Sequence, residues 1–276
     1  MRIVAGVALT RSVAPATQEL LSMKILAYQT VGKNHLEDPK ANDDVFFFSD
    51  HRDNCRRVIM ADGATSSFAG GRFARSLARA YLSCGSMDWK LKIAAARDMF
   101  ARQIDSETLS WSQKISYDRG SFATLLSLEE KPKGILATAV GDTCCFTIDK
   151  KTYLPIQSFP IESPGGFGLH PSLVGSREED GVMFLPIYRQ KYWSGKLIAY
   201  RDLANAWILC ATDAIARFIL VNREDANLMQ ALIGSLNGRE RFCRFVEDAR
   251  RRGLDVDDTT VALLDTGTRD SKGSIG

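Results

Sequence analysis

The sequence of 276 residues is poor in the side chains that build zinc sites. It has only three histidines, and its six cysteines form no Cys-x-x-Cys pair. A structural zinc site is therefore not expected. Cys144, Cys145 and Cys210 lie in apolar runs, where an unpaired cysteine acts as a small hydrophobic residue. This use of cysteine is typical of a reducing compartment, so we expect a cytoplasmic protein.

Long apolar runs and a strong charge are also missing. No stretch approaches the roughly 18 to 20 apolar residues that span a bilayer, so we expect no membrane segment. The net charge is +3, from 36 basic and 33 acidic residues, which is too small to indicate nucleic-acid binding. No P-loop or G-x-G-x-x-G follows a predicted strand, which argues against nucleotide binding of those kinds.

The remaining composition is that of an ordinary globular protein with a sizeable core, at 45% hydrophobic and 25% charged residues. We expect an N-terminal extension over residues 1–22, one domain over 23–266 and a disordered tail over 267–276. Residues 155–195 show no regular pattern and hold glycines, prolines and scattered aromatics. A long loop of this kind inside a compact domain is usually functional.

The predicted elements indicate an antiparallel α+β fold. Short runs rich in β-branched and aromatic residues predict strands at 24–30, 45–49, 57–61, 122–128, 134–140, 143–149, 205–211 and 259–265. Helical periodicity predicts helices at about 71–83, 90–104, 213–221, 224–236 and 239–252. The breaks EEKPKG and GD predict hairpin turns. Because strands come in runs and do not alternate with helices, an antiparallel arrangement is favoured over βαβ units.

Aspartates flank these predicted strands at five places. They are Asp43 and Asp44, Asp62, Asp142, Asp213, and Asp257 with Asp258. Each one alone is typical of a plain turn. Strand ends can converge on one rim, however, and several carboxylates there repel one another unless a cation lies between them. Oxygen ligands suit Mg²⁺ or Mn²⁺. Since no G-x-S-x-G elbow is present, metal-assisted hydrolysis is the favoured chemistry.

The order of these motifs resembles that of the PP2C-type, metal-dependent serine/threonine protein phosphatases, in a divergent bacterial-type form. The similarity covers about residues 24–265. It is carried by NDD from Asn42, ADGATSS from Ala61, GSFATLLSL from Gly120, VGDTCCF from Val140, ATDAI from Ala211 and DDTTVALL from Asp257. The resemblance implies a four-layer α/β/β/α sandwich, in which two antiparallel sheets are flanked by helices.

The resemblance also implies a site with two Mn²⁺ or Mg²⁺ ions and a weaker third ion. Asp62 would bridge the two ions, and the carbonyl of Gly63 would bind one of them. Asp213 and Asp257 would complete this pair, while Asp44 would bind metal-held waters. Asp142 would hold the third ion together with Asp213. A water activated by the metal would then attack a phosphoserine or phosphothreonine, and residues 155–195 would form the flap that shapes access.

Two departures from the family pattern concern the catalytic machinery. Lys40, beside Pro39, would take the place of the phosphate-binding arginine, although a lysine is a point charge and not a bidentate fork. Ala64 stands where some members have a proton-donating histidine. We therefore predict Asp44, Asp62 and Lys40 as catalytic residues.

Two functions stay open at this point. The first is an active phosphatase for phosphoproteins. We expect it to act as a monomer, with its phosphoprotein substrate and a cognate serine/threonine kinase as partners. The second is a catalytically weak or inactive module that keeps the fold and binds a phosphoprotein or kinase. Because Asp62, Asp213 and Asp257 are all present, the enzyme is favoured.

Overall fold

Two five-stranded antiparallel sheets form the centre of the protein. The computed structural model describes residues 21–34, 38, 41–49, 56–84, 88–168, 171–177 and 194–268. Sheet A has the strand order β1-β12-β11-β7-β8, and sheet B has the order β10-β6-β5-β3-β2. The strands of sheet A are β1 (Leu21–Val31), β7 (Cys144–Asp149), β8 (Pro155–Phe159), β11 (Ala206–Ala211) and β12 (Thr259–Thr268). Those of sheet B are β2 (Asp44–Phe48), β3 (Arg57–Asp62), β5 (Leu125–Lys131), β6 (Gly134–Val140) and β10 (Ser194–Ala199).

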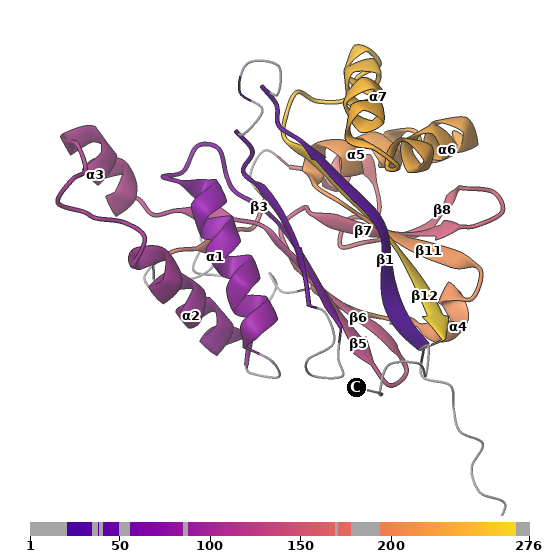
Figure 1. The fold of residues 1–276 in the computed structure, drawn as a ribbon, viewed down its shortest axis with the longest axis horizontal. Coiled ribbons are helices and arrows are strands. Elements are labelled where there is room, and N and C mark those ends of the chain that lie inside the picture. Colours follow the sequence, from indigo (N-terminus) through magenta and orange to yellow (C-terminus); the bar gives the residue numbers. More distant parts are fainter. Residues whose placement is uncertain are drawn as a thin grey trace, which may run out of the picture.

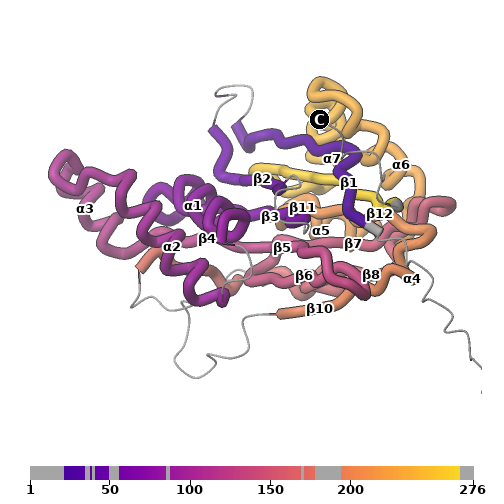
Figure 2. Tube along the Cα trace, turned by 60° about the horizontal axis from the view of Figure 1, so that its bottom comes forward, coloured from indigo at the N-terminus to yellow at the C-terminus, as the bar shows by residue number. Residues whose placement is uncertain are grey.

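Helices cover the outer face of each sheet. Figures 1 and 2 show α1 (Gly70–Ser83), α2 (Trp89–Ala101) and α3 (Trp111–Asp118) on one side of the molecule. The other side carries α5 (Asp213–Val221), α6 (Ala226–Ser235) and α7 (Arg239–Arg251). The short elements are β4 (Phe122–Ala123), which pairs with β9 (Val174–Gly175), the 3₁₀ helix η1 (Pro164–Gly166) and α4 (Tyr200–Leu203).

Three separate hydrophobic clusters follow from this layering. Successive side chains of a strand point to opposite faces, so Ile59 and Met60 of β3 enter different clusters. Ile59 packs with Phe73 and Leu77 of α1, whereas Met60 lies between the two sheets with Cys210 of β11. The third cluster joins the outer face of sheet A to α5, α6 and α7. The predicted α+β class and the α/β/β/α sandwich are therefore confirmed.

The structure corrects the prediction of a hairpin at GD. The strands before and after this turn, β6 and β7, belong to different sheets. Gly141 makes the crossing with a φ of +95°, and a Cβ atom on it would lie 2.8 Å from Thr124 Cγ2 and 2.9 Å from Ser172 O. Glycine is the residue that accepts such a conformation without strain. The crossing leaves Asp142 between the ends of both sheets.

Two other segments differ from the sequence prediction. Helix α3 was not predicted, although Ser110 and Gln113 form a capping box at its start, and S-x-x-Q is a recognisable signal for a helix start. Residues 155–195 were predicted to be irregular, but they contain β8, η1, β9 and the first residues of β10. The predicted flap residues 169–170 and 178–193, and nearly all of the predicted extension and tail, lie outside the described residues. Within the described part of the chain, no helix has the length and apolar character to cross a membrane.

Replacing Gly141 with alanine should destabilise the domain. The substitution forces a positive φ and close contacts on a residue with a Cβ, at a cost of about 1–3 kcal/mol in the free energy of unfolding. Urea denaturation measures the change. Gly195→Ala in β10 is the matched control, because a Cβ there meets nothing within 4 Å. Equal stability of the two variants would contradict the strain assigned to Gly141.

Candidate metal centre

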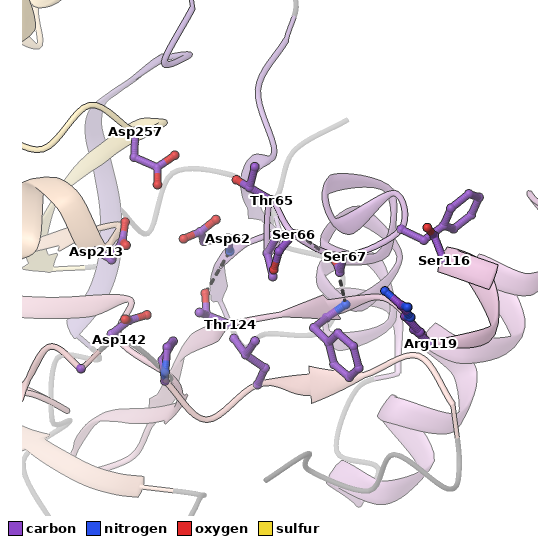
Figure 3. A pocket seen from close by; sticks show the side chains of 17 residues that line it. Asp62, Thr65, Ser66, Ser67, Ser116, Arg119, Thr124, Asp142, Asp213 and Asp257 are labelled. Atoms are coloured by element: carbon purple, nitrogen blue, oxygen red, sulfur yellow. Dashed lines mark hydrogen bonds between the residues drawn. The ribbon is translucent and has the colours of Figure 1, made fainter. Parts of the chain in front are cut away.

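Five aspartates from different elements meet at one end of the two sheets. Asp44 begins β2 and Asp62 ends β3, and the two are directly opposite in the strand register. Asp142 lies in the crossing from β6 to β7, Asp213 begins α5 after β11, and Asp257 precedes β12. Figure 3 shows the carboxylates of Asp62, Asp142, Asp213 and Asp257 directed into the same space. These four residues line a pocket of about 900 Å³.

The pKa of Asp62 depends on its burial and on the four aspartates around it. Burial raises it well above the usual value of 3.8, and the charges of Asp44, Asp213, Asp142 and Asp257 raise it further, in that order. All four other rim aspartates therefore lie near enough to act on Asp62. A carboxylate in such a place is held in its charged form only if a cation approaches it.

The pKa values of three neighbouring carboxyl groups are raised as well. Burial, followed by the charge of Asp213, raises the pKa of Asp142 to about 7. Burial also raises the pKa of Asp213 to about 6, with a further rise from Asp257 and a decrease from its hydrogen bond with the Ala214 amide. The pKa of Asp44 lies well above its usual value, again mainly because of burial. The pKa values of Asp44, Asp62, Asp142 and Asp213 are thus raised mainly by burial and further by neighbouring carboxylates.

Buried threonine hydroxyls fix Asp44 from the side of sheet A. Thr212, at the start of α5, donates its hydroxyl to Asp44 Oδ2 at 2.9 Å. The same hydroxyl accepts the Thr260 amide at 3.0 Å, and Thr260 Oγ1 lies 2.7 Å from Thr30 Oγ1. Since Asp44 belongs to sheet B and Thr260 to sheet A, this chain of bonds joins the two sheets.

Thr124, which in turn contacts Thr143, holds the backbone of Asp62. Thr124 Oγ1 accepts the Asp62 amide at 3.0 Å, and the Thr124 amide donates to the Asp62 carbonyl at 2.8 Å. Thr124 Oγ1 also lies 2.6 Å from Thr143 Oγ1, next to Asp142. Sequence reasoning missed these threonines, because threonine in a strand is common and carries no separate signal.

The backbone of Gly63, directly after Asp62, lies very close to the backbone at the start of α1. A Cβ atom on Gly63 would lie 2.3 Å from the carbonyl carbon of Gly70 and 2.4 Å from the Gly71 amide nitrogen. Gly63 therefore lies against the start of α1, and no larger residue fits without moving that helix. This places the residue predicted as a backbone ligand directly beside Asp62.

Asp43 and Asp258 have a different role from the pocket aspartates. Asp258 is 4% exposed, and its two oxygens accept the amides of Lys33 and Asp43 at 2.7 Å each. Asp43 in turn accepts a hydrogen bond from the Gly71 amide at the start of α1. These two carboxylates hold the loop after β1 in place, and neither lines the pocket.

The aspartate oxygens at this pocket are donors that fit a hard divalent cation, although their side chains stand too far apart to coordinate one together. Asp44 Oδ1 is buried without a hydrogen-bond partner, which is costly unless another group completes its coordination. Aspartate oxygens are the ligands that Mg²⁺ and Mn²⁺ prefer. In the described part of the chain, however, no three Asp, Glu, His or Cys side chains stand close enough together to hold an ion as they are.

Among the described residues, Lys33 and Arg119 are the cations found at this pocket. The predicted Lys40 lies outside the described residues. Lys33 Nζ lies 2.7 Å from Thr65 Oγ1 and 3.6 Å from Asp257 Oδ1, two residues of the pocket wall. Arg119, which follows α3, lines the pocket itself. The sequence predicted a phosphate-binding cation at Lys40, beside Pro39, and did not single out Lys33, which follows β1 and Gly32.

Comparison with known proteins supports the resemblance seen in the sequence. The family model described as Protein phosphatase 2C matches residues 31–158, which include Asp44, Asp62 and Asp142. No curated protein matches the chain. The resemblance to PP2C-type serine/threonine phosphatases is thereby confirmed.

Solved structures share the fold at low sequence identity. A bacterial serine phosphatase carrying a substitution superposes with a TM-score of 0.54 at 13% identity, covering 89% of this chain and 98% of that one. The serine/threonine phosphatase PstP, in complex with two manganese ions, gives 0.52 at 16%, covering 90% and 99%. The S. agalactiae serine/threonine phosphatase gives 0.50 at 15%, covering 89% and 99%. At these identities the likeness establishes the fold.

Metal-free protein should lose stability as the pH rises, and Asp142→Asn should relieve this loss. A carboxyl whose folded pKa is raised stabilises the fold below its unfolded pKa, and that contribution disappears as the pH rises through the folded value. For Asp142 the window runs from 3.8 to about 7. We expect the variant to melt roughly 3–10 °C higher than wild type at pH 7.5 in EDTA. The difference should be smaller at pH 5, where only the lower part of that window has been crossed.

Thermal melts of both proteins at the two pH values measure this effect. Asp202→Asn is the control, because Asp202 is exposed on α4 and outside the pocket. Added Mn²⁺ should stabilise wild type more than the Asp142 variant at pH 7.5. If the difference in melting temperature between wild type and Asp142→Asn did not change with pH, the raised pKa assigned to Asp142 would be contradicted.

Proposed function

We propose that this protein is a metal-dependent phosphatase that hydrolyses phosphoserine and phosphothreonine in proteins. The single observation that carries the proposal is that Asp62, Asp142, Asp213 and Asp257, from four different places in the chain, line one pocket. A fold that gathers uncompensated carboxylates at one pocket is destabilised by them unless a cation is part of the working state. The PP2C-type fold and the family match supply the reaction class.

The pocket aspartates would hold two Mn²⁺ or Mg²⁺ ions. Asp62 is proposed as the shared ligand, because its carboxylate interacts electrostatically with the other four. Asp213, Asp257 and the Gly63 carbonyl would complete the pair, and Asp142 with Asp213 would hold a weaker third ion. When bound, such ions supply an activated water as nucleophile and neutralise the phosphoryl oxygens. Asp44, whose Oδ1 has no hydrogen-bond partner, would accept a hydrogen bond from a water at that oxygen.

Lys33 is proposed to take the phosphate-binding role that the sequence analysis gave to Lys40. Its ammonium is held between Thr65 and Asp257 at the wall of the pocket. Thr65 and Asp257 both line the pocket, so a phosphate bound there would lie near this charge, and a lysine binds a phosphate oxygen as a point charge. The hydrogen bond to Thr65 would limit the movement of the side chain before a substrate arrives.

Asp62→Asn should nearly abolish phosphate release while leaving the fold intact. Removing the shared charge should cost at least one ion, and with it several kcal/mol of transition-state stabilisation. The measurement is release of phosphate from an aryl phosphate and from a phosphothreonine peptide, with Mn²⁺, Mg²⁺ or EDTA. Circular dichroism verifies the fold, and Asp202→Asn serves as the charge-matched control. Wild-type turnover in Asp62→Asn at saturating Mn²⁺ would refute the assignment.

The alternative function is a catalytically weak or inactive module that binds a phosphoprotein or a kinase. It is favoured by one observation, namely that no three acidic side chains in the described ranges stand at ligating distance. The same assay separates the two. Metal-independent background rates, together with tight binding of a phosphopeptide to wild type, would support the module over the enzyme. A kinase partner, the monomeric state and the cytoplasmic location remain predictions from the sequence.

Lys33→Met should raise KM for an aryl phosphate about 10-fold or more, because it removes a charge-assisted contact with the phosphate worth roughly 1.5 kcal/mol or more. Lys33→Arg should retain most of the affinity. Lys24→Met, at an exposed position of β1 outside the pocket, should behave as wild type. An unchanged KM in Lys33→Met, with metal binding also unchanged, would assign Lys33 a structural role only.

A further inference from the structure

The pocket extends well beyond the aspartates, towards α3. Its second part, which we call the α3 subsite, is lined by Ser66, Ser67, Phe68, Ser116, Arg119 and Phe122. Figure 3 shows Arg119 and Ser116 on the opposite side of Ser67 from the four aspartates. The pocket therefore has an acidic end and an end whose only charged lining residue, in the described part of the chain, is Arg119.

We propose that the α3 subsite binds an acidic side chain of the substrate, close in sequence to the phosphorylated residue. This inference rests on the proposed phosphatase function and adds a substrate class to it, namely phosphopeptides with a flanking Asp or Glu. Arg119 would contact the carboxylate, and the hydroxyls of Ser66 and Ser116 would be additional donors.

The guanidinium of Arg119 has no ion-pair partner within the described chain, although a carboxylate adjoins it in sequence. That carboxylate, Asp118, is bound by Arg177 at 2.9 Å. Arg177 also lies over the ring of Tyr117, 5.3 Å from its centroid. Arg119 is thus left exposed, with a planar set of donors suited to a carboxylate.

The backbone at Arg119 is held in place although α3 itself buries no residue. The Arg119 amide donates to the Ile115 carbonyl at 3.2 Å, and the Gly120 amide to the Tyr117 carbonyl at 3.0 Å. Tyr117 packs edge-on against Phe68 of the pocket wall, with ring centroids 5.4 Å apart. Just beyond, the Ser121 amide donates to Ser176 Oγ at 2.8 Å. These contacts fix the backbone from which the Arg119 side chain extends towards the pocket.

The remaining lining residues set the chemistry of the ligand. Ser67 is already engaged, because its hydroxyl donates to the Ala64 carbonyl at 2.8 Å and accepts the Phe122 amide at 3.2 Å. Ser66 and Ser116 make no such side-chain bonds with other described residues and keep their donors for a ligand. Phe68 and Phe122 give the subsite apolar surface. A carboxylate on a short aliphatic stem matches this combination of one cation, hydroxyls and aromatic rings.

The acidic end of the pocket explains why the contact would occur only at Arg119. Asp62, Asp142, Asp213 and Asp257 repel a second anion unless their charge is neutralised. The scissile phosphate would lie at that end, where the proposed ions neutralise it, and a flanking carboxylate would be directed away towards Arg119. A basic flanking residue would meet Arg119 with like charge, which is an element of discrimination against such substrates.

The test compares kcat/KM for a set of phosphothreonine peptides in which a single Glu, Gln or Lys is moved through each flanking position. Wild type should favour Glu over Gln about five- to tenfold at one or two positions and should disfavour Lys there. Arg119→Gln should lose that preference while its rate on an aryl phosphate stays unchanged. Arg119→Glu should reverse it, so that Lys becomes the better residue at the same position.

Lys114→Gln is the matched control, because Lys114 is exposed on α3, has the same charge and does not line the pocket. It should retain the preference for Glu. An equal loss in Lys114→Gln would mean general electrostatic attraction, and no Glu preference in wild type would overturn the subsite. Binding of the same peptides to Asp62→Asn, measured by fluorescence anisotropy, extends the test to a protein without turnover. If the aryl phosphate is not hydrolysed by wild type but the Glu preference persists in binding, the phosphatase proposal fails and the subsite stands.

Discussion

Repulsion among carboxylates at one end of the sheets is the constraint around which this structure is organised. Asp44 and Asp62 are directly opposite on neighbouring strands, an arrangement that destabilises a sheet when both residues are charged. Asp142, Asp213 and Asp257 add to the same field. Burial, and after it the charges of neighbouring carboxylates, raise the pKa values of Asp44, Asp62, Asp142 and Asp213. Under the proposed function, a divalent cation would offset this repulsion.

Carboxylates that repel one another stay close only if the backbone that carries them is held rigidly. Here buried threonines and close backbone contacts hold it. Thr212 bonds to Asp44 across the two sheets, and Thr124 holds the backbone of Asp62. Gly63 is pressed against the start of α1. The three hydrophobic clusters hold the layers that carry these loops, so the core fixes the geometry of the site without contributing to its chemistry.

The pocket joins two kinds of electrostatic environment. Its acidic end suits cations and, through them, a phosphate group, and Lys33 adds a positive charge at the wall. Its other end holds Arg119 without an ion-pair partner in the described chain. Ser66 and Ser67 lie between the two ends of the pocket. In the proposed scheme the phosphate of a substrate would bind at the acidic end, and a residue flanking the phosphorylated one would bind at Arg119.

The sequence by itself determined the fold class, most strand positions and the pocket aspartates, because apolar periodicity and acids at strand ends are local signals. The tertiary structure decided what depends on contacts distant in the chain. The GD turn was predicted as a hairpin, yet it crosses between sheets, since local turn chemistry does not record which sheet the next strand joins. Lys33 and Arg119 reach the pocket from segments 86 residues apart in numbering. Thr212 and Asp44 are separated by 168 positions. No local pattern carries such pairings, because they arise only when the two sheets pack face to face.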